Sequence, residues 1–280
     1  MGMSNIKIVT DSSADVLTLE GVEFASAPLK IITDGREFTD DAMLDVAEMT
    51  EFLSTYKGKS QTSCPNAADW IDAFGGAEQI VCLTITSGLS GSYNAAQVAA
   101  RIYESEHEGR RVFVVDSLSA GPEITLLLYR CAEMVRRGVE FDHLCESIMR
   151  YRESTGLLFM LKSLRNFANN GRVSPAVAKI AGLLGICIVG KASDEGTLEP
   201  IDKCRGEGRS LDSILAHLEA NGLCTGRVSI AHNQNAIGAK KLRSMIKARF
   251  PEVKTEVHEL RGLCSYYAEQ GGILVGYEKR

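Results

Sequence analysis

The sequence predicts an α/β protein built around a parallel sheet, and two observations support this fold class. Short apolar runs at residues 6–10, 80–83 and 111–115 have the composition of buried strands, and they alternate with helical patterns at 94–104 and 126–137. Each of these strands also runs into a loop rich in Ser, Thr or Asp. Strand and helix alternation is typical of parallel sheets, which bind ligands at the carboxyl ends of their strands.

The first apolar strand enters the segment 11–15, where Asp11, Ser12 and Ser13 can each cap a following turn. Extended segments follow at 22–24 and 29–32, and Asp34–Gly35 predicts a hairpin turn. We expect an amphipathic helix over residues 40–51, because its apolar side chains recur at helical spacing. These side chains are Met43, Val46, Met49 and Phe52.

Later strands predict a second sheet and a second domain. Residues 198–201, 227–232, 256–260 and 271–277 have strand composition, and residues 153–156 form a plausible boundary. We therefore predict domains at residues 1–155 and 156–280 that share a cleft. The most apolar stretch, 177–189, is expected to be a helix that passes into a strand, with small residues that leave room for an apolar ligand or simply pack in the core.

The composition favours a small-molecule or protein partner. Of the 280 residues, 45% are hydrophobic and 24% are charged, and the formal net charge is −5. Nucleic acids and anionic membranes are usually bound through basic surfaces, so neither is the expected partner. The sequence has neither a signal-peptide pattern nor an apolar run near the roughly 18 residues of a membrane span. We expect a cytoplasmic protein with no membrane span.

The sequence offers little that predicts catalysis. The eight cysteines form no CxxC pair and the five histidines have no metal-ligand spacing, so we expect neither a metal nor a cofactor. There is no Walker loop and no GxGxxG motif, and the segment 88–92 departs from the G-x-S-x-G pattern because its last residue is Ser92. We predict no catalytic residues, and a binding protein is favoured over an enzyme.

The strongest candidate site is the loop at residues 84–93, which connects a buried strand to a helix. It supplies two glycines, several hydroxyls and the free N–H groups of a helix start, all of which suit an anion. The segment 61–66 has a similar composition. Ser, Thr and Gly also cap helices for structural reasons, so each loop alone is equally well explained without a ligand. Four such loops on one rim of a sheet favour a small-anion site; they are residues 10–13, 62–63, 87–92 and 116–119.

Several motifs, in this order and spacing, resemble those of the DegV family over nearly the whole chain. They are Thr10–Asp11–Ser12, Thr62–Ser63–Cys64–Pro65, Ser87 to Tyr93, Asp116–Ser117, Gly171–Arg172 and Lys203–Cys204–Arg205. The resemblance implies a two-domain fold with a parallel-sheet N-terminal domain and a second α/β domain around a mainly antiparallel or mixed sheet. It also implies that one long-chain fatty acid is bound between the domains. In some members its carboxylate is presented to a separate ATP-dependent fatty acid kinase.

The resemblance also implies site residues. The fatty acid carboxylate would be held by Thr62, Ser63, Ser90 and Gly91. The wider vicinity of the head group would include Ser12, Ser87, Arg172, Arg205 and Tyr267.

Three positions differ from the family pattern. Cys64 stands where the family usually has Gln, and Cys187–Ile188 stands where a Lys-Pro pair is common. Tyr267 takes the place of a C-terminal histidine that is thought to face a phosphate, and Glu269 adds a negative charge nearby. This last difference favours lipid binding over service to a kinase. Two alternatives remain: a kinase-like or hydrolase subunit acting on a small polar substrate at the same rim, and an interaction module that binds no lipid.

Overall fold

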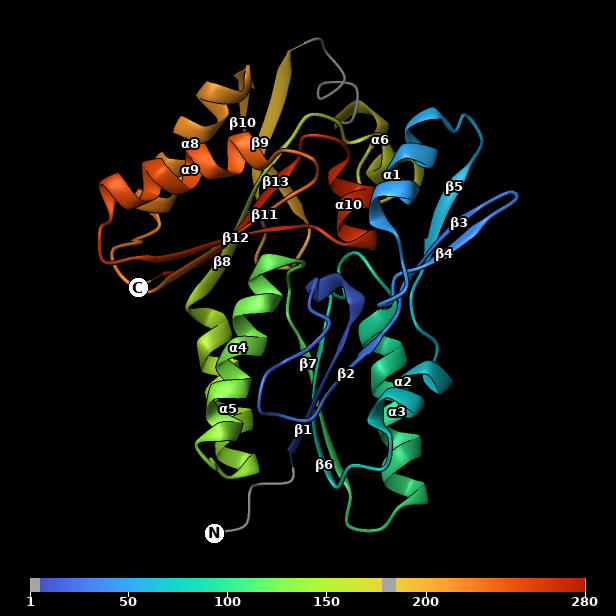
Figure 1. Ribbon diagram of the computed structural model, residues 1–280. Helices are drawn as coiled ribbons and strands as arrows, with labels where there is room; N and C mark the ends of the chain where they lie inside the picture. The colour runs from blue at the N-terminus through green and yellow to red at the C-terminus, as the bar shows by residue number, and fades with distance from the viewer. Residues whose placement is uncertain (1–5, 178–184, 280) are drawn as a thin grey trace.

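The computed structural model describes residues 6–177 and 185–279, which form three sheets and their covering helices (Figure 1). The segment 178–184, which contains part of the predicted helix-to-strand stretch, lies outside the described residues.

The first sheet has four strands and is entirely parallel, as predicted. Its strands, in spatial order, are β2 (Phe24–Ala27), β1 (Ile6–Asp11), β6 (Gln79–Thr84) and β7 (Arg111–Asp116). Two helices cover each face in Figure 1: α2 (Ala67–Phe74) and α3 (Ser92–Glu106) on one, α4 (Pro122–Arg136) and α5 (Phe141–Glu153) on the other. The short 3-10 helix η1 (Ser12–Ala14) follows β1.

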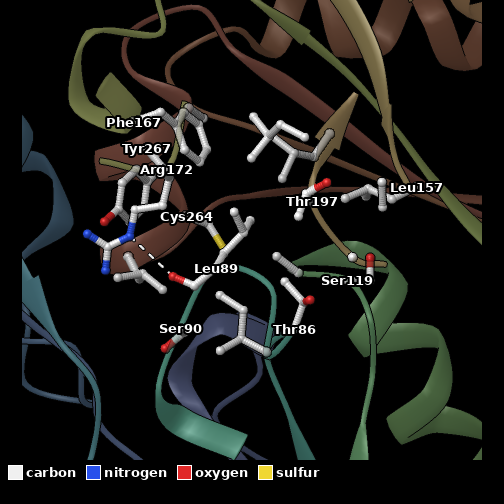
Figure 2. A pocket seen from close by; sticks show the side chains of 18 of the residues that line it. Thr86, Leu89, Ser90, Ser119, Leu157, Phe167, Arg172, Thr197, Cys264 and Tyr267 are labelled. Atoms are coloured by element: carbon white, nitrogen blue, oxygen red, sulfur yellow. Dashed lines mark hydrogen bonds between the residues drawn. The ribbon is translucent and has the colours of Figure 1, made fainter. Parts of the chain in front are cut away.

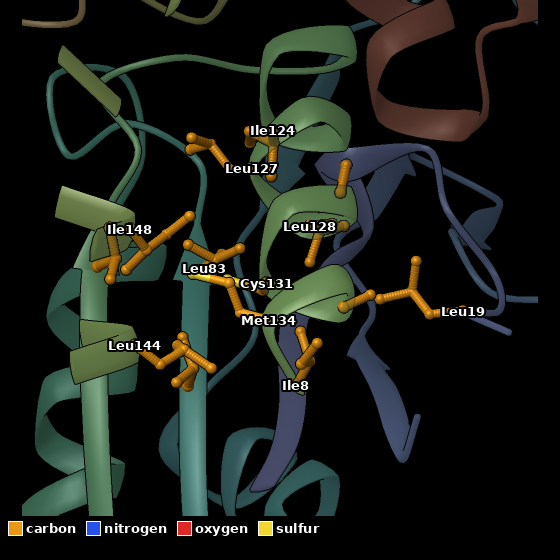
Figure 3. Close-up of a cluster of buried hydrophobic side chains, with 14 of the residues drawn as sticks. Ile8, Leu19, Leu83, Ile124, Leu127, Leu128, Cys131, Met134, Leu144 and Ile148 are labelled. Carbon is orange, nitrogen blue, oxygen red and sulfur yellow. The ribbon is translucent and has the colours of Figure 1, made fainter. Parts of the chain in front are cut away.

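Both faces of this sheet are sealed by apolar side chains. On the α4 and α5 face, Leu127 and Leu128 pack with Ile148 and with the strand residues Ile8 and Leu83 (Figure 3). On the opposite face, a second cluster forms around the fully buried Trp70 and Phe74. Burial of strands on both faces explains why they appear in the sequence as continuous apolar runs.

The second sheet has six strands and is mixed, in agreement with the expected fold class. Its strands, in spatial order, are β10 (Leu198–Arg205), β9 (Ile186–Ala192), β8 (Thr155–Leu161), β13 (Ile273–Glu278), β11 (Arg227–His232) and β12 (Lys254–Glu259). Neighbouring strands are antiparallel except β11 and β12. Helices α8 (Glu207–Ala220) and α9 (Ala236–Arg249) cover one face, and α6 (Arg165–Asn169) and α10 (Gly262–Ala268) lie toward the other.

A third, antiparallel sheet corrects one prediction. Its strands are β4 (Glu37–Thr39), β3 (Lys30–Thr33) and β5 (Ser60–Ser63), and β3 and β4 form the predicted hairpin. Thr62 and Ser63 therefore lie on β5 and not at the exit of a strand of the parallel sheet. Helix α2 begins at Ala67, beyond the end of β5, because Asn66 and Asp69 form a complete capping box there.

The predicted helix over residues 40–51 starts later than expected. Helix α1 is Val46–Thr55, and Asp45 is its N-cap because its side chain accepts a hydrogen bond from the Glu48 N–H. Met43 thus precedes the helix and is 89% exposed, whereas Met49 is buried as predicted. Among residues 6–177 and 185–279, helices that combine the length and apolarity of a membrane span are absent.

Candidate functional site

A cavity of about 280 Å³ lies where the loops of the first sheet meet the second sheet. Most of the side chains that line it are apolar and come from both halves of the chain. They include Leu29, Ile85, Leu89, Leu157, Phe159, Leu161, Phe167, Leu198, Leu263 and Leu274. In Figure 2, Ser90, Arg172 and Tyr267 lie at one side of this cavity, and Leu157, Thr197 and Ser119 lie at the other.

The loop between β6 and α3 is held in place by a buried carboxylate. Asp11 accepts hydrogen bonds from the Ile85 N–H at 2.9 Å and from the Ser92 hydroxyl at 2.6 Å, and its other oxygen accepts from Ser13. Burial raises the pKa of Asp11, and these hydrogen bonds oppose the rise. Asp11 thus fixes both ends of the loop that carries Ser90 and Gly91.

Ser90 lies just before the fifteen-residue helix α3, and its hydroxyl group can donate a hydrogen bond to a ligand. Its hydroxyl oxygen accepts a hydrogen bond from the Ser92 N–H at 3.3 Å, which leaves the hydroxyl hydrogen available to a ligand. Gly91 is the N-cap of α3 and provides no capping side chain. The helix dipole and the nearby N–H groups favour a negative charge at this point.

Arg172 supplies a positive charge to the same side of the cavity. Its Nε donates to the Leu89 carbonyl at 3.2 Å and one terminal nitrogen donates to the Asn170 carbonyl at 2.7 Å (Figure 2). These bonds use two of its five N–H donors and fix the plane of the guanidinium group. Within the part of the chain that the structure describes, Arg172 forms no ion pair, and neither Asp nor Glu lines the cavity.

Tyr267 and Thr62 form a hydroxyl pair beside Arg172. Their oxygen atoms are 2.7 Å apart, and the Arg172 guanidinium lies 5.9 Å from the centre of the Tyr267 ring. Burial raises the pKa of Tyr267, so this side chain is neutral at physiological pH. One hydroxyl donates to the other, so the pair has one hydrogen left for a ligand.

The structure brings together six of the nine predicted site residues. Those that line the cavity are Thr62, Ser63, Ser90, Gly91, Arg172 and Tyr267. Cys64, which differs from the family pattern, also lines it, and burial raises the pKa of its thiol.

The other three predicted residues do not line the cavity. The buried Ser12 hydroxyl accepts a hydrogen bond from the Leu29 N–H at 3.0 Å, so it has a structural partner. Ser87 is exposed, and its N–H donates to Asp116. Arg205 is exposed at the end of β10, opposite Ile186 and far along the hairpin from the cavity-lining residues Ala192 and Leu198. Arg205 was assigned to the head group only because it belongs to the family motif Lys203–Cys204–Arg205.

The Glu269 side chain does not lie near the head-group side of the cavity, where its closeness to Tyr267 in the sequence suggested it would be. Its carboxylate accepts hydrogen bonds from the Ser163 hydroxyl and the Asn166 N–H, and it is not among the residues that line the cavity. Its negative charge is therefore directed to α6 and not to the cavity.

The apolar wall of the cavity contains residues that the sequence reasoning missed. On β8, Leu157, Phe159 and Leu161 line the cavity, while the alternate residues Leu158 and Met160 pack under α8 and α9. Both faces of β8 are apolar, so the period-two signal of a half-buried strand is absent. The sequence therefore shows only an apolar run at 157–161 and does not show which of its side chains meet a ligand.

Comparison with known proteins identifies the family. The family model described as "Uncharacterised protein, DegV family" matches residues 5–280. The chain belongs to the DegV family. A DegV domain-containing protein of Streptococcus pneumoniae is 39% identical over 276 residues, which cover 97% of this chain and 98% of that protein. A DegV domain-containing protein of Streptococcus gordonii is 37% identical over the same length.

Two solved structures are similar to this chain over nearly their whole length. A DegV family protein from Eubacterium eligens loaded with heptadecanoic acid has 41% identity and a TM-score of 0.96, covering 98% of this chain and 100% of that one. The fatty acid kinase (Fak) B3 protein of S. pneumoniae loaded with linoleic acid has 39% identity and a TM-score of 0.96, covering 98% and 99%. The DegV fold predicted from sequence motifs is thus confirmed.

Proposed function

We propose that this DegV protein binds one long-chain fatty acid, with the carboxylate beside Arg172 and the acyl chain in the apolar part of the cavity. The observation that carries the proposal is the placement of Arg172, a cation without an acidic partner among the described residues, at one side of an apolar cavity. Such a site suits an amphiphile with one negative charge. The fatty acids in the two similar structures support this assignment.

The acyl tail and the carboxylate head group contribute differently to the free energy of binding. About a dozen buried methylenes contribute roughly 10 kcal/mol at about 0.8 kcal/mol each, before the cost of ordering the chain. Hydrogen bonds to a charged carboxylate contribute about 1.5–3 kcal/mol each, largely offset by its desolvation. The tail therefore dominates affinity, and the head group sets the direction in which the lipid lies. We assign the carboxylate contacts to Thr62, Ser63, Ser90 and Gly91, with Arg172 and Tyr267 adjacent.

We further propose that the protein is a carrier for a separate ATP-dependent fatty acid kinase. The support is the 39% identity to a protein named as the B3 protein of fatty acid kinase. In this proposal the chain supplies no catalytic residue, metal or cofactor, and its two domains, residues 1–155 and 156–280, enclose the lipid. The carboxylate would be reached from the side of the cavity where Ser90 and Arg172 lie.

Native mass spectrometry tests lipid binding directly. The protein is stripped of lipid, mixed with palmitic acid, and compared with the same protein mixed with hexadecane, which has the chain but no carboxylate. We expect one palmitate for each chain and, because the tail supplies most of the affinity, detectable but weaker uptake of hexadecane. Absence of palmitate uptake by folded protein would refute the proposal, and ATP turnover by the protein alone would favour the enzyme alternative.

A further inference from the structure

Helix α10 connects the cavity to the first half of the chain. Its residues Leu263, Cys264 and Tyr267 line the cavity. Two consecutive tyrosines attach it to β5: the Tyr266 hydroxyl lies 2.8 Å from that of Ser60, and the Tyr267 hydroxyl lies 2.7 Å from that of Thr62. A shift of α10 would therefore move the polar group that stands beside Arg172.

Two buried carboxyl groups from the first half hold the start of α10. Asp40 accepts hydrogen bonds from the Gly262 N–H at 3.0 Å and from the Leu263 N–H at 2.9 Å, one on each oxygen. Asp15 accepts one from the Arg261 N–H at 2.9 Å. These are N–H groups that a helix start leaves unpaired, so the two side chains act as its cap although they lie more than 200 residues earlier in the chain.

The packing at this contact is close. A Cβ atom on Gly262 would lie 2.6 Å from Cγ of Asp40, so only glycine lets the helix start approach that carboxyl group. Asp15 has φ +58° and Asp40 is 2% exposed. The contact between Asp40 and the start of α10 is thus closely packed and shielded from solvent.

The surroundings of Asp15 oppose the ionisation of both Asp15 and Asp40 at the same time. The titratable and charged groups that face it are Asp40, Arg261, Cys264 and, through Cys264, Asp11. Its second oxygen is buried without a hydrogen-bond partner among the described residues. Burial and the neighbouring Asp40 raise the pKa of Asp15 to about 8, and burial also raises the pKa of Asp40. Asp15 is therefore largely protonated at neutral pH.

We propose that Asp15 and Asp40 are positioning residues of the lipid site: they fix α10, and through it Tyr267. Ionisation of both would bury two neighbouring negative charges, one of them with an unpartnered oxygen, and this cost loosens the contact with α10. The inference rests on the proposed function, because it concerns the affinity of the same cavity. In this proposal Asp15 and Asp40, which do not line the cavity, determine where Tyr267 lies relative to the carboxylate of the lipid. It also predicts that lipid affinity falls as pH rises through the range in which Asp15 ionises.

The test is the pH profile of palmitate affinity between pH 7 and pH 9, measured by isothermal titration with palmitic acid below its aggregation limit. We expect the dissociation constant of the wild-type protein to rise about threefold to tenfold over this range, since one proton is lost. Asp15→Asn keeps an oxygen for the Arg261 N–H and cannot ionise, so its profile should be flat. Asp212→Asn on the exposed face of α8 is the matched control and should follow the wild type.

A second readout separates positioning from general loosening of the fold. The carboxyl carbon of ¹³C-labelled palmitate reports the hydrogen bonds of the head group by NMR. Its chemical shift should change between pH 7 and pH 9 in the wild type and stay constant in Asp15→Asn. The neighbouring Cys64 and Tyr267 have raised pKa values and remain neutral near pH 7.

The outcomes are distinct. Parallel affinity profiles in wild type and Asp15→Asn would overturn the positioning role while leaving lipid binding intact. Failure of the wild type to bind palmitate at pH 7 would overturn both this inference and the proposed function. Asp40→Asn keeps one of the two accepting oxygens and should weaken palmitate binding at pH 7 relative to Asp212→Asn.

Discussion

At the scale of single residues, the site depends on how few polar groups face an apolar cavity. Arg172 is held by two backbone carbonyls, and Ser90 and the Thr62–Tyr267 pair each keep a hydrogen to donate. A neutral hydroxyl at Tyr267 can hydrogen-bond a carboxylate but adds no charge, so Arg172 supplies the attraction to an anion. Lys191, a second cation that lines the cavity among the described residues, is paired with Glu199 at 3.5 Å.

Arg172→Gln tests whether Arg172 supplies the electrostatic attraction to the carboxylate. The variant keeps a polar but shorter side chain and loses the charge and the guanidinium donors, so we expect palmitate affinity to fall by about 1.5–3 kcal/mol, roughly tenfold to a hundredfold. Titration calorimetry with palmitic acid measures the change. Arg205→Gln removes an exposed arginine outside the cavity and should bind palmitate like the wild type. Equal effects of the two substitutions would mean that only net charge matters.

At the scale of elements, the β9–β10 hairpin closes the cavity against the loops of the first sheet. Its turn holds Gly196 at φ +72°, where a Cβ would lie 2.0 Å from the Thr86 hydroxyl and 3.0 Å from the Leu118 Cα. A Cβ on Gly88, in the loop after β6, would lie 2.7 Å from the carbonyl oxygen of Glu195. The two halves of the chain meet here through backbone, which requires glycine on both sides.

Gly196→Ala is expected to open this contact. The added methyl group must displace Thr86 or the hairpin, so we expect the free energy of unfolding to fall by about 1–3 kcal/mol and palmitate to dissociate faster. Denaturant unfolding and stopped-flow release of palmitate measure the two effects. Gly138→Ala is the control, because it has φ +69° with no atom within 4 Å of the added Cβ. A loss in Gly138→Ala as large as that in Gly196→Ala would assign the effect to backbone strain alone.

The elements also show how far the sequence predicts this protein. The strands of the parallel sheet and their helices were predictable, because buried runs and helical periods are local signals. The three-stranded sheet was missed as a unit, since β5 is a short strand of polar residues whose pairing with β3 depends on contacts about 30 residues apart. Motif order identified the cavity residues near Arg172, while the wall formed by Leu157, Phe159 and Leu161 needed the structure.

At the scale of the whole molecule, carboxyl groups buried between the halves link stability to pH. The pKa of Asp15 is about 8 in the folded chain and near 3.8 when exposed, so unfolding releases a proton between these values. A folded-state pKa that is raised means that stability falls as pH rises from about 4 to about 8. Burial raises the pKa of Asp40 and Glu123 as well, which acts in the same direction.

We therefore expect the free energy of unfolding to decrease from pH 5 to pH 8, by at most about 1.4 kcal/mol per pH unit for each such group. Urea unfolding at unit pH intervals measures the slope. Asp15→Asn should reduce the slope and raise stability at pH 8, because it removes the cost of a buried charge. An unchanged slope in Asp15→Asn would show that Asp15 is ionised in the folded protein across this range.

A crystal structure of the palmitate complex shows most directly whether the cavity holds one fatty acid with a defined direction. We predict density for one acyl chain along Leu157, Phe159 and Leu198, with its carboxylate within hydrogen-bond distance of Ser90 and on the side of Arg172. A carboxylate at the opposite end, beside Ser119 and Thr197, would contradict the account. So would a cavity that stays empty in crystals grown with saturating palmitate.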